Sequence, residues 1–339
     1  MLTLGCRVNQ SESETMGKAL ADYGFDVNYK LDKHLQSDLY IVNTCAVTHV
    51  AQTKSRHLVS KIRSTNKDAK IIVLGCATQN DSSQFKNKNV IKTFGTDKTM
   101  VVDYVKSMFG LPTTSVAQQQ GPRTRQVFIK VQDGCDNACS YCVIQVLRGQ
   151  SVSVPIEKIF GKIQEAKGNK EIVLVGINLA QWQDGDRTLV NLCWEVNRLG
   201  RPFRLSSLYI DTLTLDFIKA LSNFENFVPI FHLSIQSLST SVLNDMGRNY
   251  TAKEVITAIN RIREFFPEAK ISADIIVGFP TETDENFSET KENLVALNLD
   301  HLHVFPYSQR QGTVAAQLEQ LAPNVIRDRA KQLERVGKS

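Results

Sequence analysis

Short apolar, β-branched runs alternate with amphipathic segments along the whole chain. This alternation is typical of βα units and a mainly parallel sheet, so the pattern predicts an α/β protein. In the first third of the chain, apolar runs predict strands over residues 2–6, 38–45 and 70–76. Amphipathic segments after the first two predict helices over 11–24 and 51–63. These elements indicate an N-terminal domain built on an open parallel sheet.

A second series of βα units follows a segment without apolar periodicity. Residues 111–126 are rich in Pro, Thr and Gln and predict a linker between domains covering 1–110 and 127–339. Six further strands are predicted over residues 127–131, 171–176, 203–208, 230–235, 272–279 and 301–305. Each precedes a helical segment, so the pattern predicts a partial (βα)6 barrel with its chemistry at the C-terminal ends of the strands.

Composition sets broad limits on the class of protein. With 339 residues, 42% of them hydrophobic, the chain is long enough for two domains with their own cores. The start lacks the charge and apolar pattern of a signal peptide, and no apolar run is long enough to span a membrane. We therefore expect a cytoplasmic protein without membrane association. The net charge of +5 is compatible with a polyanionic partner but does not demonstrate one.

The densest chemistry is a cluster of cysteines in DGCDNACSYCVIQ, residues 133–145. In the reducing cytosol, clustered cysteines are more often metal ligands or catalysts than disulfides. Cys135, Cys139 and Cys142 have the spacing C-x3-C-x2-C, and no nearby second pair completes a four-ligand zinc site. Three thiolates on one loop suit a four-iron, four-sulfur (4Fe-4S) cluster whose fourth iron is open. The alternative is three loop cysteines without a shared role.

A second group of cysteines is dispersed along the sequence. Cys6, Cys45 and Cys76 each end a predicted strand of the N-terminal sheet. Because the carboxyl ends of parallel strands share one edge, these sulfurs are expected to converge there. The alternative is three small buried thiols. Cys193 lies on an apolar helical face and is predicted to be a core residue.

The cysteine loop after the first barrel strand resembles the radical S-adenosylmethionine (SAM) superfamily. TLGCRVNQSESE, VNTCAVTHVAQTKSR and VLGCATQ resemble the N-terminal domain of its methylthiotransferases, which implies a Rossmann-like layout. DGCDNACSYCVIQVLRG, HLSIQSLSTSVLNDMGRNYT, DIIVGFPTETDENF and PYSQRQGT match the radical domain of that family in order. AVTHVAQTKSR and TLGCRVNQ are most similar to the branch that acts on N6-threonylcarbamoyladenosine in tRNA.

The resemblance implies two 4Fe-4S clusters, one on each cysteine group, with SAM at the loop cluster and a sulfur species at the other. It implies a tRNA modification enzyme that inserts a methylthio group at C2 of N6-threonylcarbamoyladenosine, next to the anticodon. Implied partners are the tRNA anticodon loop and a reducing electron donor such as flavodoxin or ferredoxin. Alternatives are a methylthiotransferase for N6-isopentenyladenosine tRNA or a ribosomal protein, and a nonenzymatic iron-sulfur RNA-binding protein.

Further residues match family motifs near the ends of barrel strands and are expected to contact SAM or substrate. They are Gly176, Asn178, Ser206, Ser207, Gln236, Arg248 and Asp274. Arg248 is the strongest of these, because a guanidinium can pair bidentately with a carboxylate or a phosphate. For the others, a turn glycine, a helix cap and a backbone contact are the structural alternatives.

Three remaining features bear on recognition. Lys54, Arg56, Lys61 and Arg63 lie on a predicted helix near the second cysteine group, where a solvated face is the default interpretation. Leu238 stands where the family usually has glycine, which is expected to alter the backbone near the SAM pocket. The family ends in a small RNA-binding β-barrel, and the chain is expected to lack it.

Overall fold

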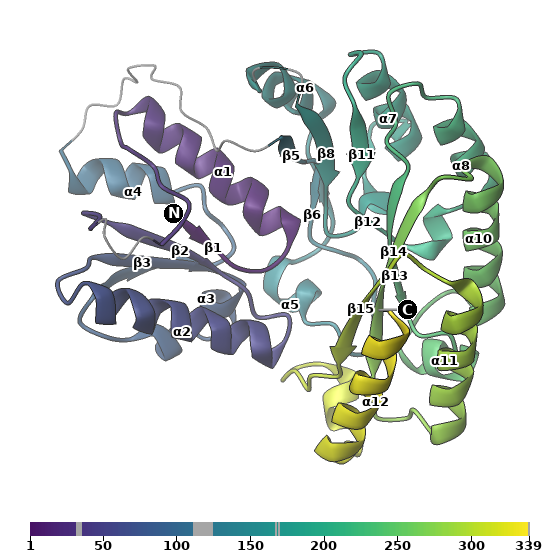
Figure 1. Ribbon diagram of the computed structural model, residues 1–339. Coiled ribbons are helices and arrows are strands. Elements are labelled where there is room, and N and C mark those ends of the chain that lie inside the picture. Colours follow the sequence, from purple (N-terminus) through teal and green to yellow (C-terminus); the bar gives the residue numbers. More distant parts are fainter. Residues whose placement is uncertain (32–35, 111–124, 167, 169, 338–339) are drawn as a thin grey trace. The chain divides into compact units, whose positions relative to one another are not determined.

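The computed structural model describes residues 1–31, 36–110, 125–166, 168 and 170–337 (Figure 1). It contains two compact units, Met1–Phe128 and Ile129–Ser339. Most of the predicted linker, residues 111–124, lies outside the described residues. The proposed domain boundaries therefore stay predictions. No helix among the described residues has the length and apolar character needed to cross a membrane.

The first unit is built on a parallel sheet with strand order β1-β2-β3-β4. Its strands are β1 (Leu2–Thr3), β2 (Tyr40–Thr44), β3 (Ile71–Gly75) and β4 (Val90–Thr93). Every residue of β2 and β3 is buried, because helices cover both faces of the sheet (Figure 1). The predicted open parallel sheet is confirmed.

Four helices and one 3-10 turn pack on this sheet. They are α1 (Arg7–Asp22), α2 (His49–Thr65), α3 (Cys76–Asn80), the 3-10 turn η1 (Ser82–Phe85) and α4 (Val101–Met108). Met16 and Leu20 of α1 pack with Val105 of α4 over one face, and α2 covers the other (Figure 1). The first strand and helix differ from the sequence prediction. β1 ends at Thr3, and α1 starts four residues early because the chain turns into the helix directly after Cys6.

The second unit contains two parallel sheets, ordered β11-β8-β5 and β12-β13-β14-β15. Their strands are β5 (Gln126–Lys130), β8 (Glu171–Val175), β11 (Phe203–Leu205), β12 (Ser207–Leu208), β13 (Ile230–Gln236), β14 (Lys270–Val277) and β15 (His301–Pro306). Ser206 alone separates β11 from β12, and its N–H donates to the Leu174 carbonyl at 2.9 Å. The segment 203–208 therefore joins the sheets into one six-strand partial barrel, as predicted.

Helices follow the barrel strands and lie outside them (Figure 1). They are α5 (Ile144–Arg148), α6 (Ile156–Glu165), α7 (Leu189–Asn197), α8 (Leu215–Ser222), α9 (Thr240–Asp245), α10 (Ala252–Phe265), α11 (Asp284–Leu297) and α12 (Pro323–Val336). Thr251 and Thr283 start α10 and α11 with capping boxes, which satisfy backbone N–H groups of the first turns. Cys193 on α7 is fully buried, in agreement with its prediction as a core residue.

A buried ion pair attaches α12 to the loop after β14. The Arg329 guanidinium donates to the Glu282 carbonyl at 2.9 Å and to its Oε1 at 2.6 Å. Glu282 Oε1 also accepts from the Gly278 N–H at 2.9 Å. Both charged side chains are almost inaccessible to solvent. Removing one partner of such a pair leaves the other charge buried and uncompensated.

We expect Arg329→Met to lower the free energy of unfolding by about 3 kcal/mol, because Glu282 would lose its counterion in a buried site. Lys331→Met is the matched control, since Lys331 is exposed on the same helix. Denaturant titration of both variants under identical conditions measures the difference. Equal midpoints for the two variants would show that the ion pair contributes nothing to stability.

Candidate functional site

The loop that follows β5 carries the three clustered cysteines. Cys135 and Cys139 are buried and Cys142 is half-buried. The Cys135 N–H donates to the Gly149 carbonyl at 3.1 Å, and the Cys142 N–H donates to the Cys139 carbonyl at 3.0 Å. The loop is therefore a defined turn that presents its thiols from fixed backbone positions.

Gln132 connects this loop to the turn after β8. Its side chain is fully buried, and Nε2 donates to the carbonyls of Asp133 at 2.9 Å and Gly134 at 2.8 Å. Its Oε1 accepts from the Asn178 N–H at 2.9 Å. Sequence reasoning missed this residue. The feature that could have identified Gln132 is its position: a polar residue directly after a buried strand and one residue before the cysteine motif.

Arg248 lies in a buried aromatic enclosure beside the loop. Its Nη2 donates to the Tyr141 hydroxyl at 2.7 Å, and its guanidinium lies 4.6 Å from the Tyr209 ring centroid and 5.8 Å from that of Tyr250. Its Nε and Nη1 are buried and have no hydrogen-bond partner. A buried guanidinium with two unused donor atoms is costly unless a ligand satisfies it. The arrangement fits an anionic group such as a carboxylate or a phosphate.

Burial also controls the protonation of the loop cysteines. It raises the pKa of Cys142 to about 11. Burial likewise raises the pKa of Cys139, although the charge of Arg248 acts in the opposite direction. Cys139 and Cys142 are therefore protonated at neutral pH as free thiols, and binding of a metal centre must release their protons.

The cysteine spacing does not suit a single metal ion. Within the described ranges, no three His, Cys, Asp or Glu side chains are grouped closely enough to hold one. Cys139 and Cys142 nevertheless interact electrostatically with each other and with Cys135. In a 4Fe-4S cluster each thiolate binds a different iron, so the ligands stand farther apart than around one zinc ion. Three thiolates on one loop fit such a cluster and leave its fourth iron without a protein ligand.

Two of the residues predicted to bind SAM lie directly behind this loop. Asn178 Nδ2 donates to the Cys135 sulfur at 3.9 Å, and its Oδ1 accepts from the Ala180 N–H at 3.2 Å. A Cβ on Gly176 would come within 3.0 Å of Gln132 Oε1, so a larger residue would displace Gln132. Both positions support the cysteine loop. Their predicted contact with SAM stays a prediction.

Three further predicted residues lie where β11–β13 end. Ser206 Oγ is buried without a hydrogen-bond partner, and Ser207 Oγ lies 2.6 Å from Ser234 Oγ. Neither serine caps a helix, so the alternative of a cap is wrong. Gln236 is buried and has a φ of 74°, which is uncommon for a residue other than glycine. Such strain occurs most often at functional sites.

Asp274 does not lie at a strand end. It is in the middle of β14, where its Oδ1 lies 3.0 Å from His232 Nε2, and Ser272 Oγ lies 2.9 Å from His232 Nδ1. The rings of His232 and His303 are in edge contact at 5.1 Å. The expected strand-end position of Asp274 is therefore wrong, and its side chain pairs with His232 on the neighbouring strand, which the sequence position alone did not reveal.

Leu238 does not need the conformational freedom of glycine. It is buried, its φ is not among the positive values, and its N–H lies 3.3 Å from Thr290 Oγ1. The positive φ falls at Gln236 instead. The expected change of the backbone near the SAM pocket stays a prediction.

The second cysteine group gathers at one edge of the N-terminal sheet. Thr44 pairs with Gly75 at the ends of β2 and β3, so Cys45 and Cys76 follow neighbouring strand ends. A Cβ on Gly5 would lie 2.7 Å from the Cys45 Cβ, which places the segment before Cys6 against Cys45. Cys45 and Cys76 are buried and Cys6 is exposed. Three thiols from three strands thus share the carboxyl edge.

A buried amide network fixes this edge. Asn9 Nδ2 donates to the carbonyls of Leu4 at 2.8 Å and Thr44 at 3.0 Å. Asn43 Nδ2 donates to the Asn9 carbonyl at 2.9 Å. Asn9, Asn43 and Thr44 are fully buried. Sequence reasoning missed Asn9, although an asparagine three residues after a strand-end cysteine was the available signal.

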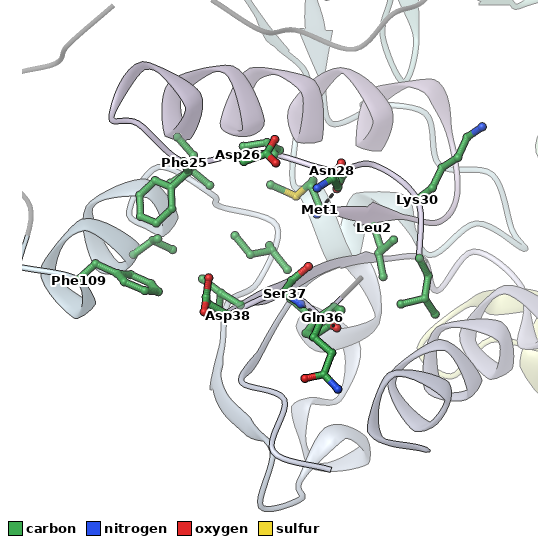
Figure 2. A pocket seen from close by; sticks show the side chains of 17 residues that line it. Met1, Leu2, Phe25, Asp26, Asn28, Lys30, Gln36, Ser37, Asp38 and Phe109 are labelled. Atoms are coloured by element: carbon green, nitrogen blue, oxygen red, sulfur yellow. Dashed lines mark hydrogen bonds between the residues drawn. The ribbon is translucent and has the colours of Figure 1, made fainter. Parts of the chain in front are cut away.

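A cavity of about 220 Å³ lies elsewhere in this unit (Figure 2). Met1, Leu2, Phe25, Asn28 and Phe109 line it. The starts of β1 and β2 border it, so it lies at the amino edge of the parallel sheet, opposite the cysteines. It takes no part in the site.

Comparison with known proteins agrees with both halves of this description. Residues 1–95 match the model of the uncharacterized protein family UPF0004, and residues 129–294 match that of the radical SAM superfamily. Threonylcarbamoyladenosine tRNA methylthiotransferase MtaB of Thermotoga maritima is 35% identical, and the match covers 97% of this chain and 81% of the relative. The protein of that name from Chlamydia pneumoniae is also 35% identical, with 100% and 81% covered.

A solved structure shows the same fold. The radical SAM methyltransferase TsrM from Kitasatospora setae superposes with a TM-score of 0.64 at 16% identity, covering 93% of this chain and 76% of that one. The partial barrel and its cysteine loop thus define a protein of the radical SAM class. The chain belongs to the radical SAM methylthiotransferase family.

Proposed function

We propose that this protein is a transferase that inserts a methylthio group at C2 of N6-threonylcarbamoyladenosine, next to the anticodon of tRNA. The observation that carries the proposal is the pair of three-cysteine groups, one on the barrel loop and one at the edge of the N-terminal sheet. The relatives named for this activity support the choice of nucleoside. The C–H bond at adenine C2 resists acid-base chemistry, which explains why a radical and a separate sulfur site would be combined.

The residues of each group would have distinct tasks. Cys135, Cys139 and Cys142 would hold one 4Fe-4S cluster, and Cys6, Cys45 and Cys76 a second one at which sulfur is delivered. SAM bound at the first cluster supplies a 5'-deoxyadenosyl radical. These assignments make residues 1–110 the domain of the second cluster and 127–339 the radical SAM domain, joined by the linker 111–126.

Arg248 and Asn178 would support the first site. The unpartnered Nε and Nη1 of Arg248 are suited to the carboxylate of SAM. Asn178 donates to the Cys135 sulfur. Hydrogen bonds to ligand sulfurs are one of the means by which a protein sets the reduction potential of a cluster. Gly176, Ser206, Ser207, Gln236 and Asp274 are proposed to shape the remaining wall of the site.

The proposed partners follow from the substrate. A single-stranded anticodon loop allows the adenine to be splayed out and to enter the site. Each catalytic cycle needs an external electron, and a protein such as flavodoxin or ferredoxin would supply it. The expected location is the cytosol, where tRNA is found and thiols remain reduced.

The test of the proposed function is mass spectrometry of tRNA nucleosides from a strain that lacks the gene. The methylthio derivative of N6-threonylcarbamoyladenosine should be missing and should return when this chain is expressed. The methylthio derivative of N6-isopentenyladenosine is measured in the same samples. Loss of that nucleoside instead would assign the protein to the other tRNA branch, and no change in either would remove tRNA as the substrate.

Replacing Arg248 by Lys is expected to weaken SAM binding about tenfold to a hundredfold, because an ammonium lacks the planar set of donor atoms that a guanidinium holds at fixed positions. Equilibrium dialysis against SAM measures the effect, with iron content determined in parallel to show that the cluster is retained. Arg327→Lys, on the exposed side of α12, is the control. Unchanged affinity in the Arg248 variant would remove this residue from the SAM site.

A further inference from the structure

The positive charge of the chain is concentrated in one segment. Residues 49–90 contain eight of the 40 Lys and Arg residues and only two of the 35 acidic residues, which gives the segment a net charge of +6. The remainder of the chain has 32 basic and 33 acidic residues and a net charge of −1. The overall charge of +5 therefore comes from this segment.

The structure places these cations on one continuous surface of the first unit. All eight are exposed. Seven of them lie on α2 and on the two segments beside it and are called the α2 basic surface: Lys54, Arg56, Lys61, Arg63, Lys67, Lys86 and Lys88. Arg56 Nη1 donates to Gln84 Oε1 at 3.2 Å, and Arg63 Nε donates to Asn89 Oδ1 at 3.2 Å. These bonds attach the segment after η1 to α2, so Lys86 and Lys88 flank the helix.

Ion pairs do not neutralise the charges on this surface among the described residues, although Lys86 interacts electrostatically with Asp81. None of the seven side chains forms an ion pair with a described residue, and the hydrogen-bond acceptors of Arg56 and Arg63 are uncharged. Asp68 and Asp81 are the acidic residues of the segment. Seven exposed cations against two acids exceed what an ordinary solvated helix face needs for solubility, and they produce a local positive potential.

The surface extends from the cysteine edge of the sheet, where α2 begins, to the amino edge, where Lys67 and Lys88 precede the starts of β3 and β4. α2 starts at His49, shortly after Cys45, and its 17 residues extend for about 25 Å along one face of the sheet (Figure 1). Lys54 and Lys61 are separated by two helical turns, as are Arg56 and Arg63, so the cations form rows along the helix. A polyanionic strand that follows these rows is brought to Cys6, Cys45 and Cys76.

We propose that the α2 basic surface binds the phosphate backbone of the substrate tRNA and guides its anticodon loop to the cysteine edge of the N-terminal sheet. This inference rests on the proposed function and adds the surface that recognises the RNA. An acidic electron-transfer protein is the other polyanion to consider. The cations extend along the whole of α2. This extent favours RNA as the partner, because a protein electron donor needs to reach only the edge near the cluster.

The test uses the full chain with both clusters reconstituted and tRNA carrying N6-threonylcarbamoyladenosine. One variant changes Lys54, Lys61, Lys86 and Lys88 to Gln. The matched control changes Lys158, Lys219, Lys253 and Lys331 to Gln, four exposed lysines of the second unit. Both variants lose the same charge, so they differ only in where it is removed. Iron content and SAM cleavage without tRNA should equal those of the unmodified protein in both.

We expect the first variant to bind tRNA at least about tenfold more weakly at ~0.1 M salt. The plot of log affinity against log salt concentration should become shallower by about 3, because each lost phosphate contact removes nearly one unit of slope. The control should keep the original affinity and slope.

Other outcomes would overturn the proposal in distinguishable ways. An equal loss of tRNA affinity in both variants would show that only the net charge of the protein determines tRNA binding. Intact tRNA binding by the first variant, together with loss of reduction by a flavodoxin-type donor, would assign the surface to the electron donor and leave the proposed function standing. Failure of the unmodified protein to bind tRNA would reject both the proposed function and this surface.

Discussion

Replacing Cys6, Cys45 and Cys76 by Ala is expected to abolish methylthio transfer while reductive cleavage of SAM remains measurable. The reason is the separation of the two cysteine groups: one lies at the edge of the N-terminal sheet, the other on the loop after β5. Removing the first group takes away the sulfur site and leaves the loop and Arg248 unchanged. Transfer to tRNA is measured by nucleoside mass spectrometry, and SAM cleavage by the release of methionine and 5'-deoxyadenosine.

The matched control for this variant is Cys193→Ala. Cys193 is fully buried on α7 among apolar residues, so its removal tests the effect of losing a thiol that binds no cluster. Both activities should persist in the control. Full methylthio product from the triple variant would defeat the assignment of a sulfur site to Cys6, Cys45 and Cys76.

Replacing Cys135, Cys139 and Cys142 by Ala should remove all SAM cleavage and one of the two clusters. Anaerobically reconstituted protein is expected to contain about eight irons per chain, and this variant about four. The loss of activity should be complete, because the loop supplies every protein ligand of the cluster that binds SAM. Iron analysis and the absorption of the remaining cluster measure the result. A variant with its full iron content would show that these three thiols are not the ligands.

Much of the architecture could be predicted because buried parallel strands contain continuous apolar runs in the amino-acid sequence. β2 and β3 are buried along their whole length, and each begins with a run of apolar residues, 40–42 and 71–74. β4 and α4 escaped prediction for the opposite reason. Val90–Thr93 is a short edge strand with partly exposed residues, so its sequence has no clear period.

The cysteines could be located from sequence, whereas their surroundings could not. Spacing and strand ends identified both groups without any knowledge of distances. The enclosure of Arg248 depends on Tyr141, Tyr209 and Tyr250, which come from three separate segments. The pair of His232 and Asp274 likewise forms across the register of β13 and β14. Such contacts depend on the tertiary structure, and local sequence patterns do not predict them.

The most direct test of the central claim is a side-by-side assay of two tRNA substrates. Anaerobically reconstituted protein with SAM, a sulfide source and a reductant is offered tRNA bearing N6-threonylcarbamoyladenosine and, separately, tRNA bearing N6-isopentenyladenosine. Mass spectrometry of the digested nucleosides should show the methylthio derivative of the first and none of the second. Product from N6-isopentenyladenosine alone, or from neither tRNA while SAM is still cleaved, would contradict the account.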